Sequence, residues 1–369
     1  MGGSVVSGRY RTVAVVAAMV LTTLSALTAS SARALAATQI QVYGTWLCGT
    51  DECTWATAPN MTTFDQDNHW LIDRGDGTPS VNLVVLAFVN PLKLLDQTTD
   101  SGDVNGVPAG MTSAVVNYFT SHGIRVMLSI GGATYTSAWD TALSQNATQL
   151  GLNASAVARQ LGVGIEIDYE NGTSPNLAGL QAFITAYRAQ EPYDATGANP
   201  AARLTIDLAA GDQYLTALDL YATQNWLTTS NPVLDYANAM VSNKQLSTSA
   251  QEAQWQEHVS GEPRYSPPVP PLAPAKFTGS MYLAGTSKIA PECTNFSASL
   301  ESSTGSFVRN VAPSGAGTTP GMLGYMFWAA GQPSAHGTNT FPPDTCQGGV
   351  GVGSSTYSVP FPMPALRQS

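Results

Sequence analysis

Three carboxylates occupy every second position of one short stretch of the chain. Glu166, Asp168 and Glu170 alternate with Ile, Ile and Tyr, residue types that favour an extended strand. Successive side chains of a strand point to opposite faces, so the three acids share one face with neighbours ~6.5 Å apart. Only 11% of the residues are charged. This row of acids is therefore the first candidate for a site that performs chemistry.

The chemistry that such a row can perform is acid–base catalysis. If the acidic face points into a low-dielectric space, like charges resist joint ionisation and at least one carboxyl group should keep its proton. A carboxylic acid that is protonated near neutral pH can act as a general acid. The alternative is an exposed strand face dotted with charge, but this strand lies among parallel strands, whose two faces are both buried.

The elements that must position these acids recur at a period of about forty residues. Eight apolar, β-rich runs start 32 to 44 residues apart, at 40–43, 83–89, 126–130, 165–169, 204–208, 236–241, 280–283 and 324–328. Helix-like stretches lie between them, at 112–121, 176–188 and 248–258. The last of these begins with a capping box formed by Thr248 and Gln251.

Alternating strands and helices over this length predict an α/β fold, a (β/α)8 TIM barrel formed as a single domain by residues 37–369. An open doubly wound sheet is the structural alternative. After Trp328 the chain is rich in Gly, Pro and Ser, and no strong pattern indicates a regular final helix. The Pro-rich segment 263–274 lies between the sixth and seventh runs and is interpreted as a loop.

Residues 1–36 have the pattern of a secretory signal peptide. Arg9 and Arg11 precede the apolar run 12–27, and the small residues 34–36 offer a cleavage site. An uncleaved membrane anchor is the alternative. Cleavage would remove three arginines and no acid, which changes the formal net charge from −10 to −13. We therefore expect a secreted, extracellular protein that binds neither membrane nor nucleic acid.

The cysteines and histidines give further expectations. An even number of cysteines in an exported protein indicates disulfides, and of the three possible pairings we favour Cys48 with Cys53 and Cys293 with Cys346. The four histidines are scattered along the chain, at His69, His122, His258 and His336. We expect no metal site and no cofactor.

Three motifs resemble those of glycoside hydrolase family 18, the chitinases and related endo-β-N-acetylglucosaminidases. The fourth strand of that family has the sequence Asp-Gly-x-Asp-x-Asp-x-Glu, and residues 163–170 here are Val-Gly-Ile-Glu-Ile-Asp-Tyr-Glu. The family's Ser-x-Gly-Gly motif matches residues 129–132 at the end of the third strand, and its closing Trp on the eighth strand matches Trp328. Val163 and Glu166 stand where the family has Asp.

The resemblance implies a role for each acid. Glu170 would protonate the glycosidic oxygen and then serve as base, Asp168 would hold the substrate's N-acetyl group and share a proton with Glu170, and Glu166 would tune both. The nucleophile would be the substrate's own acetamide carbonyl, so no second catalytic carboxylate is required. Asp207 on the fifth strand is the inward candidate that could instead support double displacement, whereas residues 279–285 of the seventh strand contain no acid.

The resemblance also implies substrate-binding residues. Trp328 would form an apolar floor under the sugar, because an indole face matches the C–H face of a pyranose. The family's sixth strand carries Met or Gln and then Tyr two residues later, and the match here is Met240 and Ser242. Tyr282 or Tyr214 could supply the missing hydroxyl. Further aromatic residues could stack on other sugars, although each alone fits a core or rim position: Trp46, Tyr135, Trp139 and Trp226.

These residues lead to one hypothesis and two alternatives. The leading hypothesis is a secreted, monomeric chitinase-like glycosidase that cleaves β-1,4-linked N-acetylglucosamine polymers with retention. The first alternative is an endo-β-N-acetylglucosaminidase that acts on N-glycans. The second is a chitin-binding, lectin-like barrel with little turnover, which is motivated by Val163 and Ser242. In each case the partner is a polysaccharide or glycan.

Overall fold

The structure is a computed structural model that describes residues 1–2, 41–50, 52–73, 77, 79–208, 215–240, 248–282, 298–312 and 321–331. The chain divides into two compact units, Met1–Thr38 and Gln39–Ser369. Several expectations fall outside the described residues: the signal peptide beyond residue 2, the cleavage site, the Cys293–Cys346 pair and the segment after residue 331. The second unit contains all the elements discussed below.

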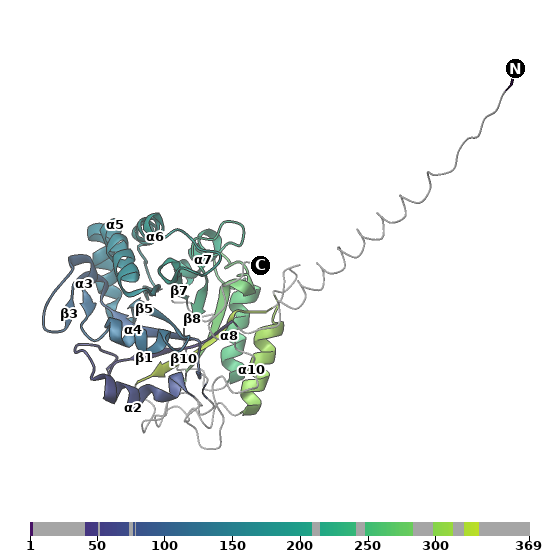
Figure 1. Ribbon diagram of the computed structural model, residues 1–369. Coiled ribbons are helices and arrows are strands. Elements are labelled where there is room, and N and C mark those ends of the chain that lie inside the picture. The colour runs from purple at the N-terminus through teal and green to yellow at the C-terminus, as the bar shows by residue number, and fades with distance from the viewer. Residues whose placement is uncertain are drawn as a thin grey trace. The chain divides into compact units, whose positions relative to one another are not determined.

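Eight parallel strands close into a barrel (Figure 1). Each barrel strand pairs with the next one along the chain, and the last pairs with the first. The strands are β1 (Val42–Cys48), β2 (Leu83–Val89), β5 (Arg125–Gly131), β6 (Gly164–Asp168), β7 (Leu204–Leu208), β8 (Ala237–Ala239), β9 (Phe277–Tyr282) and β10 (Gly324–Ala330). This arrangement confirms the (β/α)8 barrel and excludes the open sheet. A separate antiparallel pair, β3 (Asp103–Val104) and β4 (Val107–Pro108), follows the second barrel strand.

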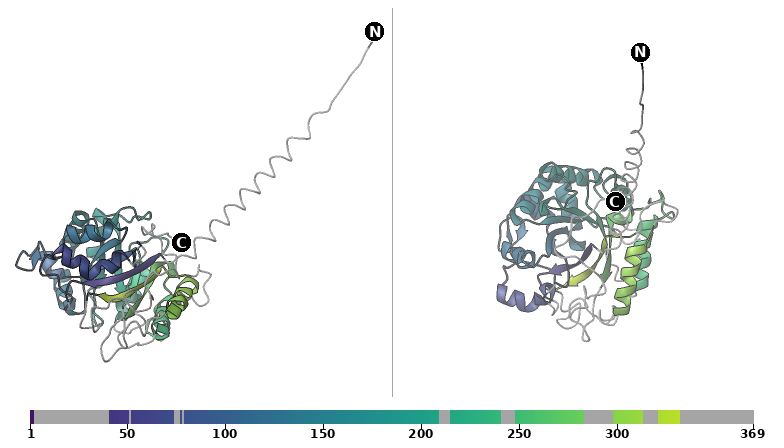
Figure 2. Two further views of the ribbon diagram at one scale, coloured as in Figure 1. Left: turned by 60° about the horizontal axis from the view of Figure 1, so that its bottom comes forward. Right: turned by 45° about the vertical axis from the view of Figure 1, so that its right-hand side comes forward.

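Helices surround the barrel, as Figures 1 and 2 show. Among the described residues they are α2 (Met61–Ile72), α3 (Pro91–Asp96), α4 (Ser113–Thr120), α5 (Thr136–Leu161), α6 (Leu177–Gln190), α7 (Thr216–Asn225), α8 (Thr248–Ser260) and α10 (Ala298–Asn310). The three helices expected from the sequence are confirmed, with ends within two residues of those predicted. Side-chain oxygens of Asn60, Asn90, Thr112 and Asn176 accept hydrogen bonds from the first turns of α2, α3, α4 and α6.

Some strand ends differ from the sequence prediction. β1 was expected to end at Tyr43 but continues to Cys48, because it pairs with β2 on one side and β10 on the other. Trp46 therefore lies within the first strand. β6 ends at Asp168, so Glu170 lies two residues beyond the strand, and Trp328 lies inside β10 instead of closing it.

The two faces of each barrel strand pack against different partners. Ile165 and Ile167 of β6 belong to the large apolar core that includes residues of the surrounding helices. The alternate residues Glu166 and Asp168 point to the barrel interior, where a smaller apolar cluster includes Trp46 of β1 and Met127 of β5. The expected orientation of the acidic face toward the interior follows directly from this alternation.

Candidate active site

Glu166 lies in the barrel interior and accepts hydrogen bonds from two other strands. The indole Nε1–H of Trp46 donates to Oε1 over 2.8 Å, and the amide Nδ2–H of Asn238 donates to Oε2 over 2.5 Å. The hydroxyl of Thr278 donates in turn to the Asn238 amide oxygen. Side chains from β1, β6, β8 and β9 thus form one buried network around this carboxyl group.

The environment of Glu166 raises its pKa. The side chain is 0% exposed, and this burial raises its pKa from 4.5 to about 7. The hydrogen bonds from Trp46 and Asn238 act in the opposite direction, because they favour the charged form. Glu166 can therefore change its protonation state near neutral pH without contact with solvent.

Asp168, the last residue of β6, is also buried in the barrel interior. It is 5% exposed, and its Oδ1 atom has no hydrogen-bond partner among the described residues. Burial raises its pKa well above the usual range, and the charges of Glu170 and Glu166 raise it further. The direction of this shift favours the protonated form of Asp168, which is the behaviour expected for an acid in such a row.

Two glycines allow the neighbouring strand to approach the backbone of Asp168. The N–H of Gly132 donates to the Asp168 carbonyl oxygen over 3.0 Å, and Trp139 Nε1–H donates to the same oxygen over 3.1 Å. Gly131 has φ +125°, and a Cβ atom there would lie 1.8 Å from that oxygen. The Ser-x-Gly-Gly motif thus acts through the backbone, as a support for the strand that carries the acids.

Glu170 lies just past the C-terminal end of β6, the end at which the active sites of such barrels form. It is partly exposed, and burial raises its pKa to about 7. Its neighbours along the chain are anchored to α5. The Tyr169 hydroxyl donates to Asp140, and the Asn171 amide donates to both oxygens of that carboxylate over 3.0 Å. These contacts on either side of Glu170 fix the backbone that presents its carboxyl group.

A fourth acid, Asp207 of β7, joins the same cluster. It is buried, and burial raises its pKa well above the usual range, with further increases from the charges of Glu166 and Asp168. Its Oδ1 atom has no hydrogen-bond partner among the described residues. The sequence already indicated Asp207 as an inward acid, and the structure places it beside the β6 row.

Trp328 offers a partly exposed aromatic surface near the acids. Its ring stacks on Phe88 of β2, with centroids 5.6 Å apart and planes at 24°, and it lies 6.1 Å from the ring of Trp46. Phe88 is also partly exposed, and sequence reasoning missed it. The peptide bonds Ala87–Phe88 and Trp328–Ala329 are both cis.

The other aromatic residues lie at core or rim positions, the alternative given for each of them in the sequence analysis. Trp46 is 3% exposed, so it contributes to the site through its hydrogen bond to Glu166 and has little surface to offer a sugar. Trp139 and Trp226 are fully buried core residues, which excludes them as stacking platforms. Tyr135 is partly exposed at the start of α5.

The sixth and seventh barrel strands carry the remaining predicted residues. Met240 follows β8, is partly exposed and donates its backbone N–H to Leu208 of β7 over 2.5 Å. Tyr282 lies at the end of β9, in register with Trp328. Ser242 and Tyr214 lie outside the described residues, so the source of the sixth-strand hydroxyl remains a prediction.

Three further findings concern the described part of the chain. Cys48 and Cys53 form a disulfide, as predicted, at the end of β1. Within the described ranges, no group of three or more His, Cys, Asp or Glu side chains is arranged to hold a metal ion. None of the described helices combines the length and the hydrophobicity that a membrane span requires.

Comparison with solved structures finds similar chains. A GH18 chitinase from Pseudoalteromonas aurantia is 12% identical with a TM-score of 0.45, covering 78% of this chain and 94% of that one. The Ostrinia furnacalis Group IV chitinase is 11% identical with a TM-score of 0.46 and coverages of 85% and 98%. The Aspergillus fumigatus chitinase ChiC is 13% identical with a TM-score of 0.46 and coverages of 78% and 91%.

All three are chitinases. No family model and no curated protein matches the chain. The barrel and its acidic interior are established by the strand pairings and hydrogen bonds of this chain, independently of the likeness to these structures.

Proposed function

We propose that the chain is a chitinase-like glycoside hydrolase that cleaves β-1,4-linked N-acetylglucosamine polymers with retention of configuration, assisted by the substrate's own acetamide group. The observation that carries this proposal is the pair of β6 acids, Glu166 and Asp168, which point into the barrel and are followed by Glu170, a partly exposed acid with a raised pKa. We also propose that the protein is secreted. The Cys48–Cys53 disulfide supports an oxidising compartment.

Glu170 supplies the proton in this mechanism. Because burial raises its pKa to about 7, a large fraction of the molecules hold the proton at neutral pH and can donate it to the glycosidic oxygen. The bond between C1 and that oxygen breaks, and the departing sugar leaves with a new hydroxyl group. Glu170 becomes a carboxylate that can later accept a proton from water.

The acetamide of the substrate takes the place of an enzymic nucleophile. Its carbonyl oxygen forms a bond to C1 as the leaving group departs, which gives an oxazolinium ion. Asp168 stabilises this ion by accepting a hydrogen bond from the acetamide N–H, and it shares a proton with Glu170, whose charge raises the pKa of Asp168. Water then attacks C1, loses its proton to Glu170 and restores the acetamide, so that the product has the β configuration.

Two further acids lie in the barrel interior with this pair. Glu166 accepts hydrogen bonds from Trp46 and Asn238 and has a pKa of about 7, and burial raises the pKa of Asp207. The raised pKa disfavours the carboxylate form of Asp207, which is the form that would attack in double displacement. The stacked rings of Trp328 and Phe88 provide the apolar surface on which the sugar would lie.

The proposal is tested with the purified protein and soluble N-acetylglucosamine oligomers. Product formation is followed for the wild type and for Glu170→Gln, and the first product's anomeric configuration is read by NMR. We expect β product from the wild type and a rate lower by roughly three orders of magnitude in the variant. Equal rates would defeat the assignment. Release of glycans from a glycoprotein, with oligomers untouched, would indicate an N-glycan substrate, and binding without product would indicate a lectin-like barrel.

A further inference from the structure

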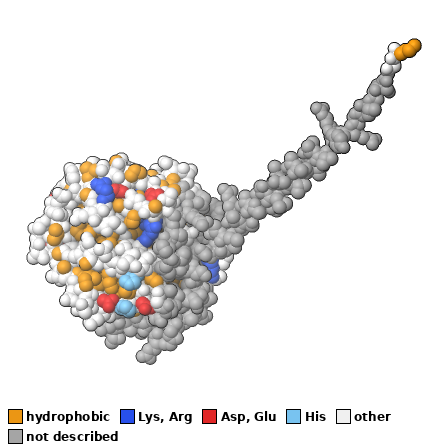
Figure 3. Space-filling model, in the orientation of Figure 1, with side chains coloured by type: hydrophobic (Ala, Val, Ile, Leu, Met, Phe, Trp, Pro, Cys, Tyr) orange, Lys and Arg blue, Asp and Glu red, His pale blue; other side chains and the backbone are white. Residues whose placement is uncertain are grey.

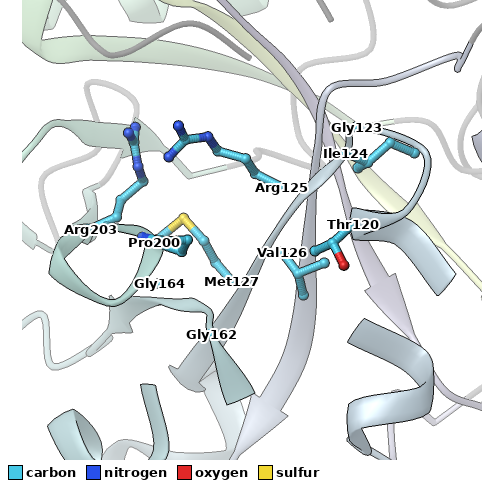
Figure 4. Close-up of a pocket in the computed structure, with 10 residues that line it drawn as sticks. All are labelled: Thr120, Gly123, Ile124, Arg125, Val126, Met127, Gly162, Gly164, Pro200 and Arg203. Carbon is cyan, nitrogen blue, oxygen red and sulfur yellow. The ribbon is translucent and has the colours of Figure 1, made fainter. Parts of the chain in front are cut away.

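The end of the barrel opposite the acids contains two inward arginines, Arg203, which is buried, and Arg125, which is partly exposed. Arg125 begins β5, Arg203 precedes β7 and Tyr236 precedes β8, and each occupies an inward position by the same alternation that directs Glu166 and Asp168 inward. Figure 4 shows the two guanidinium groups directed toward one another beside Met127. Two like charges thus meet at the bottom of a barrel whose top is acidic.

These cationic side chains have unused hydrogen-bond donors. Arg203 is 3% exposed, and its Nε and Nη1 atoms are buried without a hydrogen-bond partner. The Nη1 atom of Arg125 and the hydroxyl of the fully buried Tyr236 are also buried without a hydrogen-bond partner. Arg125 uses only its Nη2 atom, which donates to the Gly197 carbonyl oxygen over 2.6 Å. Within the described residues, neither arginine forms an ion pair with an acid.

Two acids in the surroundings of the arginines, Asp235 and Asp194, accept hydrogen bonds from other groups. Asp235 accepts from Arg188 Nη2 over 3.2 Å and from the backbone N–H of Leu204 over 2.8 Å. Asp194 accepts from the backbone N–H groups of Thr196 and Asn199 in its own loop. Their charges raise the pKa of Arg125 from a distance, but among the described residues neither carboxylate forms an ion pair with Arg125 or Arg203.

Two neighbouring positive charges without ion-pair partners destabilise the folded protein, which points to a missing partner. Burial lowers the pKa of Arg125 to about 10, and the positive charge of Arg203 lowers it further. Buried donors in folded proteins are almost always paired, and an uncompensated buried charge is strongly destabilising. The chain has a net charge of −10, and Lys and Arg side chains are scattered on the face drawn in Figure 3, so the meeting of two arginines at one place is a local feature.

The space beside these groups can hold such a partner. Arg125 and Arg203 line a pocket of about 150 Å³ together with Met127, Gly164 and Pro200. This volume exceeds the ~30 Å³ that one water molecule occupies in the liquid. Gly164 keeps the arrangement possible, because a Cβ atom there would lie 3.0 Å from the Arg203 Cβ and 3.0 Å from Met127 Cγ.

We propose that this pocket binds a small inorganic anion, held by the guanidinium groups of Arg125 and Arg203, with Tyr236 as a neighbouring donor. The anion accepts hydrogen bonds from the unpaired donors, and its negative charge reduces the repulsion between the two arginines. Guanidinium groups bind planar and tetrahedral oxyanions through paired N–H donors, and the same donors bind chloride. This site lies at the opposite end of the barrel from the proposed catalytic acids and is independent of the proposed function.

Thermal unfolding of the full chain tests the proposal in solution. The midpoint is measured in chloride, phosphate or sulfate at constant ionic strength, with gluconate as the large reference anion. We expect a saturable rise of roughly a few degrees for the wild type and none for Arg203→Met. The exposed Arg264 provides the matched control, since Arg264→Met should respond as the wild type does. A response to chloride alone identifies a halide site, and a response to phosphate and sulfate alone identifies an oxyanion site.

Crystals soaked in bromide provide a second measurement that needs no variant. The proposal predicts an anomalous peak between the guanidinium groups of Arg125 and Arg203, or its displacement by phosphate if the site prefers oxyanions. The proposal is overturned if the crystals show neither bromide nor phosphate at this position and the unfolding midpoints show no specific effect. The midpoints show none if they are equal in all salts, or if they rise equally in the wild type and Arg203→Met. If Arg203→Met does not fold, the wild-type titration and the soaked crystals decide the matter alone.

Discussion

Replacing Glu166 by Gln should stabilise the protein at pH 8 and change its stability little at pH 4. Burial raises the pKa of this fully buried side chain from 4.5 to about 7. A group with a raised pKa in the folded state stabilises the fold below its unfolded pKa, and this contribution is lost as the pH rises through the folded pKa. The difference between 4.5 and about 7, at about 1.4 kcal/mol per pH unit, corresponds to ~3 kcal/mol.

The hydrogen-bond network around Glu166 can accommodate the amide. Gln keeps an oxygen that accepts from Trp46 Nε1–H, and its NH2 group can donate to Asn238 once the Asn238 side chain rotates its oxygen inward. The hydroxyl of Thr278, which now donates to Asn238, can then accept from the rotated amide nitrogen. The contacts of position 166 with Trp46 and Asn238 are both kept, so the expected gain at pH 8 is not offset by the loss of either hydrogen bond.

Urea unfolding followed by tryptophan fluorescence between pH 4 and pH 8 measures this effect. The wild type should lose stability across the range more steeply than Glu166→Gln, and the exposed Glu52 provides the control, since Glu52→Gln should match the wild-type slope. A remaining slope in Glu166→Gln is expected from the other buried acids. If Glu166→Gln and the wild type lose stability in parallel, or if the variant is the less stable protein at pH 8, the reasoning about this carboxyl group is wrong.

Two further substitutions test the frame of the site. Asn238→Leu removes the donor to the Oε2 atom of Glu166, and we expect urea unfolding at pH 7 to show a loss of roughly 1–3 kcal/mol; an unchanged midpoint would contradict the network. Gly131→Ala would place a Cβ atom 1.8 Å from the Asp168 carbonyl oxygen at φ +125°, so we expect loss of more than ~3 kcal/mol or failure to fold. Gly162→Ala, with open space around the Cβ position, should cost only about 1–2 kcal/mol, and equal losses in both glycine variants would refute the close-contact argument.

The acidic face could be predicted from the sequence because a strand alternates its side chains with a fixed period. Once the strand of Glu166 and Asp168 was placed in a parallel barrel, only one face could point inward. The partners of Glu166 could not be predicted in the same way. Trp46 and Asn238 reach it across the barrel, and which side chains meet there depends on the stagger and order of strands far apart in sequence.

The strand ends illustrate a second limit of the sequence. The segment after Tyr43 begins with Gly and Thr, and its apolar pattern is weak, yet pairing with β2 and β10 extends the strand to Cys48. Tertiary hydrogen bonding overrode local preference here. The anchoring of the Glu170 turn by Asp140 was also missed, because that contact depends on how α5 packs beside the strand end. Similarly, the stacking of Phe88 on Trp328 joins β2 to β10.

The central claim is that Glu170 holds a proton for the departing sugar oxygen. It is tested most directly by comparing two substrates of Glu170→Gln, an N-acetylglucosamine oligomer and an aryl glycoside whose phenolate leaves without protonation. Loss of a general acid slows only the reaction whose leaving group needs the proton.

The account predicts that kcat/KM for the oligomer falls by roughly 10³-fold or more in the variant, whereas formation of the oxazolinium ion from the aryl glycoside, measured as the burst of released phenol, is reduced far less. Equal losses on both substrates, or no loss on either, would contradict the role assigned to Glu170.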